Sequence, residues 1–426
     1  MDISNEIGNH NDELLKSHER SLTAAQQLLL LSNEKLDDLF KKLSTFQVAV
    51  PSWALGTGGT RFGRFPSGGE PRNLEEKIED VGLLHALSRA TDSISLHIPW
   101  DVPENPDDTK ALLQQHGLSI DAVNSNTFQD QRDHTHSYKF GSLCHTDASV
   151  RRQAIEHNLE VVEHGKSLGS RCLSVWLADG SNFPGQHNFR RAYSNTLSAL
   201  QDIYNGMPDD WTMLIEYKPY EPNFYSMVLP DWGTSLKMSE ACGDRAHVLV
   251  DLGHHLPNTN IEQIVARLQL YGRLGGFHFN GSQYGDDDLT TGAIKPFQLF
   301  LIFIELVMGA NDRSIKNPPV AYMIDASHNT KDPLEDLLMS LENIRTAYAK
   351  ALLVDYAALN EAQARNDVAQ AERLLQDAFL SDVRPLLAET RKRAGGSIDP
   401  VSAFRSQKIR EKLISQRGKL AVATGL

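Results

Sequence analysis

Eight short apolar runs recur along the chain, and each has the length of a buried strand. Between them lie stretches in which apolar residues recur at the three- and four-residue spacing of amphipathic helices, for example 149–168 and 295–310. This alternation is typical of a parallel sheet covered by helices. The predicted strands span residues 46–53, 93–100, 119–125, 172–178, 212–217, 247–252, 274–280 and 320–326.

Eight such units within about 280 residues favour a closed barrel over an open sheet. An open dinucleotide-binding sheet would need a glycine fingerprint after its first strand, and residues 56–60 (GTGGT) lack the required spacing. We therefore predict an α/β fold, a (β/α)8 barrel with additional C-terminal helices. The expected divisions are a helical segment at 1–45, the catalytic barrel at 46–331 and a helical extension at 332–426.

Charge and cysteine content narrow the functional classes. The net charge is −13 and there is no long basic run, which argues against nucleic acid or an anionic membrane as the main partner. The three cysteines are widely spaced and fit neither a disulfide framework nor a zinc ribbon. No apolar run approaches the roughly 18 residues that cross a bilayer, and the first residues lack a signal-peptide core. We expect a soluble cytoplasmic protein that acts on small molecules.

Four consecutive predicted strands end on an ionisable residue: Glu216, Asp251, His278 and Asp325. A buried charge is costly without a partner, and three carboxylates with an imidazole suit a hard divalent cation. Neighbouring barrel strands bring their carboxyl ends together at the mouth where active sites lie. Any one of these residues alone could simply close a strand or cap a helix. Four in succession predict a metal site.

A second group of candidate ligands follows two of these strands. Asp286 and Asp288 are two residues apart, so they point the same way in an extended loop, and His254 lies three residues after Asp251. Together they predict a second cation close to the first, an arrangement that polarises and orients oxygen substrates. The alternative is a solvated acidic loop at the start of a helix.

Three further polar residues are candidates for contact with a substrate. Lys218 follows Glu216 by two residues, and Ser327 follows Asp325 by two, so each is expected on the same side as its metal ligand. Lys218 is predicted to hold a substrate oxygen and Ser327 a hydroxyl. His97 ends the second strand among apolar residues, where a structural role is as reasonable as a catalytic one.

Aromatic residues at the predicted mouth indicate the class of substrate. Trp53, Trp100 and Trp176 fall at strand ends, and aromatic faces in such places stack on the apolar face of a sugar ring. The glycine-rich loop 56–71, which contains Phe62, is predicted to be a lid that excludes water.

From about Val48 to about Phe404 the chain resembles the L-rhamnose isomerases, specifically the broad-specificity bacterial type. The segment after the fifth strand, from Glu216 to Pro222, is also similar to xylose isomerases. At 281–283 the residues Gly-Ser-Gln differ from the more polar pattern of better-known members, which bears on loop rigidity or substrate preference. The motifs that carry the resemblance are VPSWALGTGGTRFGRFP (50–66), SLHIPWD (95–101), SNTF (125–128), DGSNFPGQ (179–186), YEPNFYS (220–226), VDLGHHLPNTNIE (250–262), GGFHFNGSQYGDDD (275–288) and MIDASHN (323–329).

The resemblance implies a TIM barrel in a homotetramer, with two Mn²⁺ per subunit and Co²⁺ or Mg²⁺ as other possible cations. It implies that Glu216, Asp251, His278 and Asp325 bind a structural metal, and that the catalytic metal uses the second group. It assigns Lys218 and Ser327 to substrate contacts, and His97 to the ring oxygen or to ring opening. It also implies a catalytic role for Asp325, which would hold a metal-bound water or hydroxide that moves the hydroxyl proton. These assignments are expectations.

The reaction implied is aldose–ketose isomerisation, from L-rhamnose to L-rhamnulose and from other aldoses such as D-allose to D-allulose. The alternatives are a metal-dependent sugar epimerase or hydrolase on the same barrel, or a sugar-binding barrel without catalysis. The route of the hydrogen between C1 and C2, by hydride shift or through an enediol, stays open. So does the sugar used in the cell, because one hydroxyl or methyl is worth only about 1–3 kcal/mol of discrimination.

Overall fold

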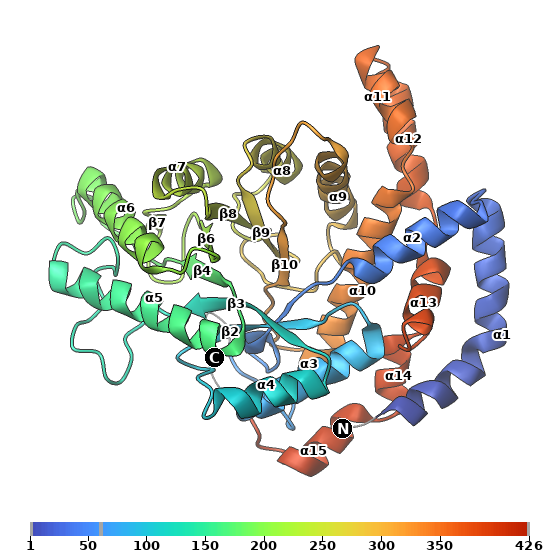
Figure 1. Ribbon diagram of the computed structural model, residues 1–426, viewed down its shortest axis with the longest axis horizontal. Coiled ribbons are helices and arrows are strands. Elements are labelled where there is room, and N and C mark those ends of the chain that lie inside the picture. The colour runs from blue at the N-terminus through green and yellow to red at the C-terminus, as the bar shows by residue number, and fades with distance from the viewer. Residues whose placement is uncertain (1–2, 59–62, 424–426) are drawn as a thin grey trace.

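A computed structural model describes residues 3–58 and 63–423. Its centre is an eight-stranded parallel barrel whose strand order follows the chain (Figure 1). The first and last strands meet through Ala49, which donates its N–H to Tyr322 O at 2.8 Å and accepts from Ile324 N at 3.0 Å. The predicted (β/α)8 barrel is confirmed. Its strands are β1 (Val50–Pro51), β2 (Ser93–Ile98), β3 (Ser119–Ser125), β4 (Cys172–Trp176), β6 (Thr212–Glu216), β8 (Ala246–Asp251), β9 (Leu274–Phe279) and β10 (Ala321–Ile324).

Helices follow the strands and cover the outside of the barrel. In α4, Asn105 caps the first turn and Pro106 opens it. α10 packs against α9 and α3 and so completes the ring. The ring consists of α3 (Leu74–Ser88), α4 (Pro106–Gln115), α5 (Ala148–Leu168), α6 (Phe189–Gly206), α7 (Trp232–Cys242), α8 (Ile261–Leu270), α9 (Pro296–Asn311) and α10 (Pro333–Leu352).

The two ends of the chain form a helical layer beside the barrel. Phe40 and Leu43 of α2 share a buried apolar cluster with Leu386 and Leu387 of α13, although more than 300 residues separate them. In Figure 1, α11 and α12 project away from the rest of the molecule. The layer contains α1 (Ser4–Leu28), α2 (Asn33–Thr45), α11 (Tyr356–Ala364), α12 (Val368–Leu380), α13 (Arg384–Arg393), α14 (Pro400–Ser406) and α15 (Ile409–Arg417).

Alternation along the strands explains why the site residues face the barrel interior. Leu214, Leu249 and Met323 form a small buried cluster together with Ala49 and Ala122. Side chains two apart in a strand share a face, so the residues two positions later also point inward, at the carboxyl ends. These residues are the predicted ligands Glu216 at the end of β6, Asp251 at the end of β8 and Asp325 directly after β10. A short apolar layer therefore supports the polar mouth from below.

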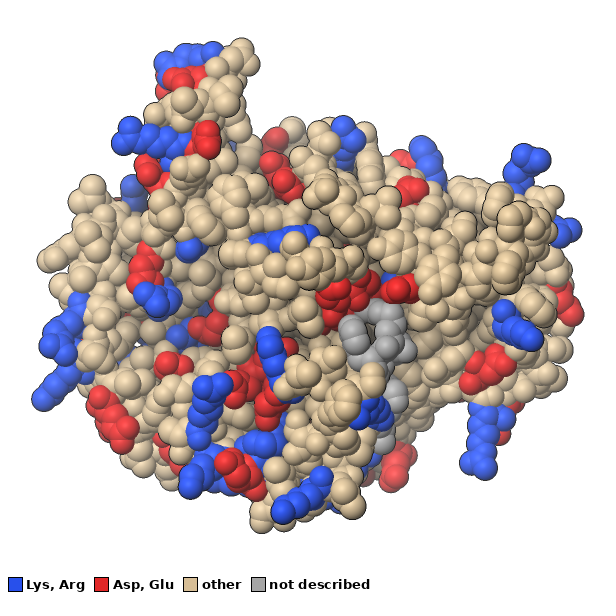
Figure 2. Space-filling model, turned by 180° about the vertical axis from the view of Figure 1, so that it is seen from behind, with Lys and Arg blue, Asp and Glu red and all other residues tan. Residues whose placement is uncertain are grey.

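Smaller elements and the outer surface complete the description. The antiparallel pair β5 (Gly180–Ser181) and β7 (Ser226–Met227) lies outside the barrel, and a 3-10 turn, η1 (Ser52–Ala54), follows β1. On the face shown in Figure 2, Lys and Arg are interspersed with Asp and Glu. Within the described residues, no helix combines the length and apolarity that a bilayer span requires.

Candidate active site

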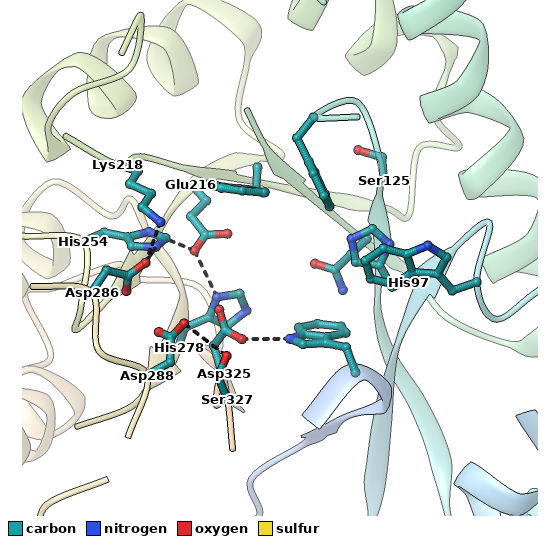
Figure 3. A pocket seen from close by; sticks show the side chains of 15 residues that line it. His97, Ser125, Glu216, Lys218, His254, His278, Asp286, Asp288, Asp325 and Ser327 are labelled. Atoms are coloured by element: carbon teal, nitrogen blue, oxygen red, sulfur yellow. Dashed lines mark hydrogen bonds and ion pairs between the residues drawn. The ribbon is translucent and has the colours of Figure 1, made fainter. Parts of the chain in front are cut away.

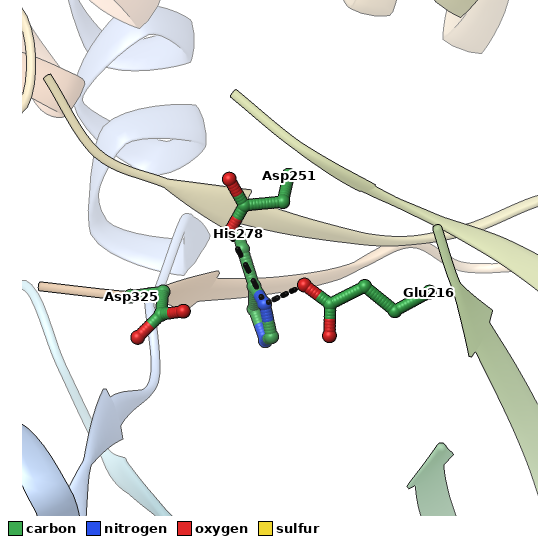
Figure 4. Close-up of side chains that lie close together, drawn as sticks. All are labelled: Glu216, Asp251, His278 and Asp325. Atoms are coloured by element: carbon green, nitrogen blue, oxygen red, sulfur yellow. Dashed lines mark hydrogen bonds and ion pairs between the residues drawn. The ribbon is translucent and has the colours of Figure 1, made fainter. Parts of the chain in front are cut away.

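Four adjacent strand ends converge on one point at the mouth of the barrel (Figure 4). Glu216, Asp251, His278 and Asp325 each offer one ligand atom within 4.8 Å of the others. His278 Nδ1 lies 3.1 Å from Glu216 Oε1 and 3.5 Å from Asp251 Oδ2. The structure therefore brings together all four residues that the strand-end pattern singled out. Their donors and spacing suit a divalent cation.

A second group shares one residue with the first. Asp251, His254 and Asp286 again lie within 4.8 Å of one another, and all three are buried. His254 spans the two groups, with Nδ1 3.2 Å from Glu216 Oε1 and Nε2 3.4 Å from Asp286 Oδ2. Asp288 lines the same cavity but is not part of this trio. The second group thus lies beside the first, with Asp251 common to both. It contains two of the three predicted residues, His254 and Asp286, and has Asp251 in place of Asp288.

The acidic and imidazole side chains of the two groups shift one another's pKa values. Burial raises the pKa of the Glu216 carboxyl, but the charge of His278 and hydrogen bonds from His254 and His278 outweigh it and lower that pKa to about 2. Burial also disfavours charged imidazoles, yet the neighbouring carboxylates hold the pKa of both histidines well above the usual value. The carboxylates of the two groups outnumber the two imidazoles. This excess of buried negative charge is the environment that a cation would neutralise.

The two groups form one side of a cavity of about 670 Å³, measured out to its open mouth (Figure 3). Trp53 belongs to the turn η1 rather than to a strand, and its Nε1 donates to Asp325 Oδ1 at 2.8 Å. The cavity is lined by Trp53, His97, Trp100, Asn124, Ser125, Phe128, Trp176, Glu216, Lys218, His254, His278, Asp286, Asp288, Asp325 and Ser327.

Aromatic rings line the side opposite the carboxylates. His97 stacks on Trp100 with ring centroids 4.2 Å apart, and it meets Trp53 and Phe128 edge-on at 5.7 and 5.6 Å. Phe128 in turn lies 4.7 Å from Trp176. Burial, aided by nearby positive charge, lowers the pKa of His97 to about 3, so this imidazole is neutral at neutral pH. The cavity is polar on one side and aromatic on the other, which matches the two faces of a sugar.

Lys218 and Ser327 both contact the loop that carries Asp286 and Asp288. Lys218 Nζ lies 2.5 Å from Asp286 Oδ2 and 5.5 Å from the centroid of the Trp176 ring, and its side chain is 1% exposed. Ser327 donates its N–H to Asp288 O at 2.9 Å and its hydroxyl lies 3.5 Å from Asp288 Oδ2. Both residues therefore lie in the cavity as predicted, and each also supports an acidic residue of the second group.

Comparison with known proteins identifies the family. No family model matches the chain. It is 49% identical over 99% of its length to a probable sugar isomerase of Mesorhizobium japonicum, covering 98% of that protein. It is 51% identical to a second probable sugar isomerase, from Rhizobium meliloti, over 92% of this chain and 90% of that one. The chain belongs to this sugar isomerase family.

A weaker sequence match and two solved structures extend the comparison for this sugar isomerase family member. A xylose isomerase of Thermus thermophilus is 26% identical over 184 residues, 40% of this chain and 44% of that protein. An L-ribulose 3-epimerase structure superposes with a TM-score of 0.54 at 14% identity, covering 73% of this chain and 98% of that one. A D-allulose 3-epimerase from Methylomonas sp. gives 0.52 at 15% identity, with 71% and 97% covered. At such identities, these structures show the shared fold alone.

Several polar and aromatic residues of the site were not predicted from the sequence, and one predicted residue cannot be placed. Phe62 lies outside the described residues. Ser125 and Phe128 line the cavity but were quoted only within the SNTF motif, and Asn280 was not singled out at all. Ser125 and Asn280 end or directly follow strands, β3 and β9. Extending the strand-end criterion from ionisable residues to all polar ones would have found them.

Proposed function

We propose that this sugar isomerase family member interconverts aldoses and ketoses, with L-rhamnose to L-rhamnulose as the main reaction and D-allose to D-allulose among others. We propose two divalent cations per subunit, Mn²⁺ by preference, with Co²⁺ or Mg²⁺ as substitutes. The observation that carries the proposal is a pair of ligand groups that share the buried Asp251 and whose other members line one cavity, which also has an aromatic side.

The residues present fit these cations. One ion would be held by Glu216, Asp251, His278 and Asp325, and the other by Asp251 with His254 and Asp286, aided by Asp288. Bound cations would polarise the oxygens at C1 and C2 of the sugar and stabilise the negative charge that develops there.

The side chains of the protein supply orientation and proton transfer. A hydrogen moves between C1 and C2, and the hydroxyl proton must move between the two oxygens. We assign this proton transfer to Asp325, whose carboxyl belongs to the four-residue group and lines the cavity. Trp53 orients this carboxyl through its indole N–H. Both routes for the hydrogen, hydride shift or enediol, make this same demand.

The remaining cavity residues bind the sugar. Lys218 would donate to a substrate oxygen and Ser327 to a hydroxyl, while neutral His97 accepts from the hydroxyl at the ring-opening end. The rings of Trp53, Trp100 and Trp176 stack on the apolar face of the substrate. Since all these side chains are held by contacts within the barrel, they are preorganised for an open-chain sugar.

The wider context follows from the same resemblance. We propose a cytoplasmic homotetramer, in which reducing conditions keep Cys144, Cys172 and Cys242 as the free thiols that the structure records. Exposed leucines at the α1–α2 turn and the end of α12, such as Leu30 and Leu380, offer apolar surface for subunit contacts.

The test is a panel assay with and without metal. Purified protein stripped with a chelator should lose ketose formation from L-rhamnose and D-allose, and added Mn²⁺ should restore it. Chromatography that resolves aldose, ketose and ketose epimers distinguishes the reactions. Interconversion of two ketoses without any aldose would show a sugar epimerase and reject the proposal, as would full activity after chelation.

A further inference from the structure

Asn280, the first residue after β9, donates to Asp251 at the end of β8 and to Asp288 in the loop after β9. It is 2% exposed. Its Nδ2 donates to Asp251 Oδ1 at 2.8 Å and, at the longer distance of 3.5 Å, to Asp288 Oδ1. Its Oδ1 accepts from Ser282 Oγ at 3.0 Å. A flipped amide would set its oxygen against two carboxylate oxygens, so the contacts determine the orientation.

Asp251, the first of these partners, belongs to both ligand groups. Its Oδ1 is held twice, by the Asn280 amide and by the N–H of Gly253 at 2.7 Å. The other oxygen, Oδ2, faces the ligand residue His278, whose Nδ1 lies 3.5 Å away. The packing is close, since a Cβ on Gly253 would come within 2.2 Å of Asp286 Oδ1. The amide therefore helps to determine which oxygen of the shared carboxylate faces the ligands.

The second partner, Asp288, lies on a loop that closes at Asn280. Gly281 and Leu289 exchange backbone hydrogen bonds of 2.8 and 2.9 Å, so residues 281–289 form a closed loop. Asp286 and Asp288 of that loop project into the cavity. Asn280 thus stands where the loop joins the barrel and touches its last acidic residue.

We propose that Asn280 is a positioning residue that couples the two cation sites. Its amide holds the shared Asp251 and the loop residue Asp288 in one arrangement, so that both groups are ready for their ions. A neutral amide does this without cancelling the negative charge that attracts cations, as a lysine would. Such outer partners of ligands typically contribute 10–100-fold to metal affinity. The proposal rests on the two-cation function above.

The test measures metal binding without sugar. Asn280→Leu keeps the shape of the side chain and removes its donors. Titration calorimetry of chelator-stripped protein with Mn²⁺ should show that the variant binds its weaker ion about 10–100-fold less tightly than wild type. The tighter ion should change less, because three ligands of the four-residue group do not touch Asn280. The matched control is Asp287→Asn, which alters the caps on Gln283 and Tyr284 in the same loop and should leave both affinities within about threefold.

Each outcome decides the proposal. Unchanged Mn²⁺ affinities in Asn280→Leu would overturn it, as would an equal loss in the Asp287→Asn control, because loop order alone would then explain the effect. If Asn280→Leu fails to fold, Ser282→Ala takes its place: it frees the amide to rotate and should produce a smaller loss in the same direction, and no loss would overturn the proposal. Wild-type protein that forms no ketose would instead reject the proposed function.

Discussion

Replacing Lys218 by Met removes the one lysine of the cavity while keeping a side chain of similar length. In the structure its ammonium lies 2.5 Å from Asp286 Oδ2, and both side chains are almost wholly buried, 1% and 3% exposed. After the change, His254 remains beside Asp286, with its Nε2 3.4 Å from Asp286 Oδ2. The variant therefore tests whether this lysine serves substrate, carboxylate or both.

The expected loss of stability follows from the burial of the pair. Removing one partner of a buried ion pair costs about 3–5 kcal/mol, and His254 places this case near about 3 kcal/mol without metal. Unfolding entropy of roughly 2.1 cal/mol/K per residue is about 0.9 kcal/mol/K for 426 residues, so the melting temperature should fall by about 3 °C. With Mn²⁺ present, Asp286 gains a cation and the deficit should shrink. The kcat/KM should fall by about 10²-fold, the range for loss of one preorganised donor.

The assay combines thermal unfolding, with and without Mn²⁺, and initial rates on L-rhamnose and D-allose. The matched control is Lys237→Met, because Lys237 pairs with Glu240 on the surface, 71% and 40% exposed, and its removal should change neither readout. A melting deficit in Lys218→Met that is the same with and without Mn²⁺ would refute the charge argument. Rates within about threefold of wild type on both sugars would refute the placement of the substrate.

Three further predictions concern the acidic loop, His97 and a buried ion pair elsewhere in the fold. The double variant Asp286→Asn, Asp288→Asn should lose most turnover, while calorimetry should still detect Mn²⁺ binding at the four-residue group. Its melting temperature should fall because the buried Lys218 loses its charged partner. Normal turnover would show that the two carboxylates only face solvent and bind no catalytic metal. His97→Gln should make the free energy of unfolding less sensitive to acid. The pKa of His97 is about 3 in the folded state and about 6.5 in the unfolded state, so wild-type stability falls as the pH drops below about 6.5, by up to about 1.4 kcal/mol per pH unit. An equally steep loss in the variant would contradict this. Lys77→Met should destabilise by about 3–5 kcal/mol in denaturant titrations, since it leaves Asp101 buried without its 2.6 Å partner, and Lys77→Met with Asp101→Asn should recover part of that loss.

The sequence by itself determined the barrel and the principal acidic residues of its mouth. Alternation is local: a residue two positions after Leu214, Leu249 or Met323 must share its face, whatever the loops do. Parallel strands then bring their carboxyl ends to one rim. Apolar runs that end on Glu216 or Asp251 therefore predict both the fold and the convergence of ligands.

Only the tertiary structure decided which side chains support those ligands. The contacts of Asn280 with Asp251, of Lys218 with Asp286, and of Trp53 with Asp325 join residues 29, 68 and 272 positions apart. No periodicity along the chain encodes them, because they depend on the paths of irregular loops and on which oxygen of a carboxylate turns inward. The same holds for the packing of α2 on α13, which depends on how the two ends of the chain meet.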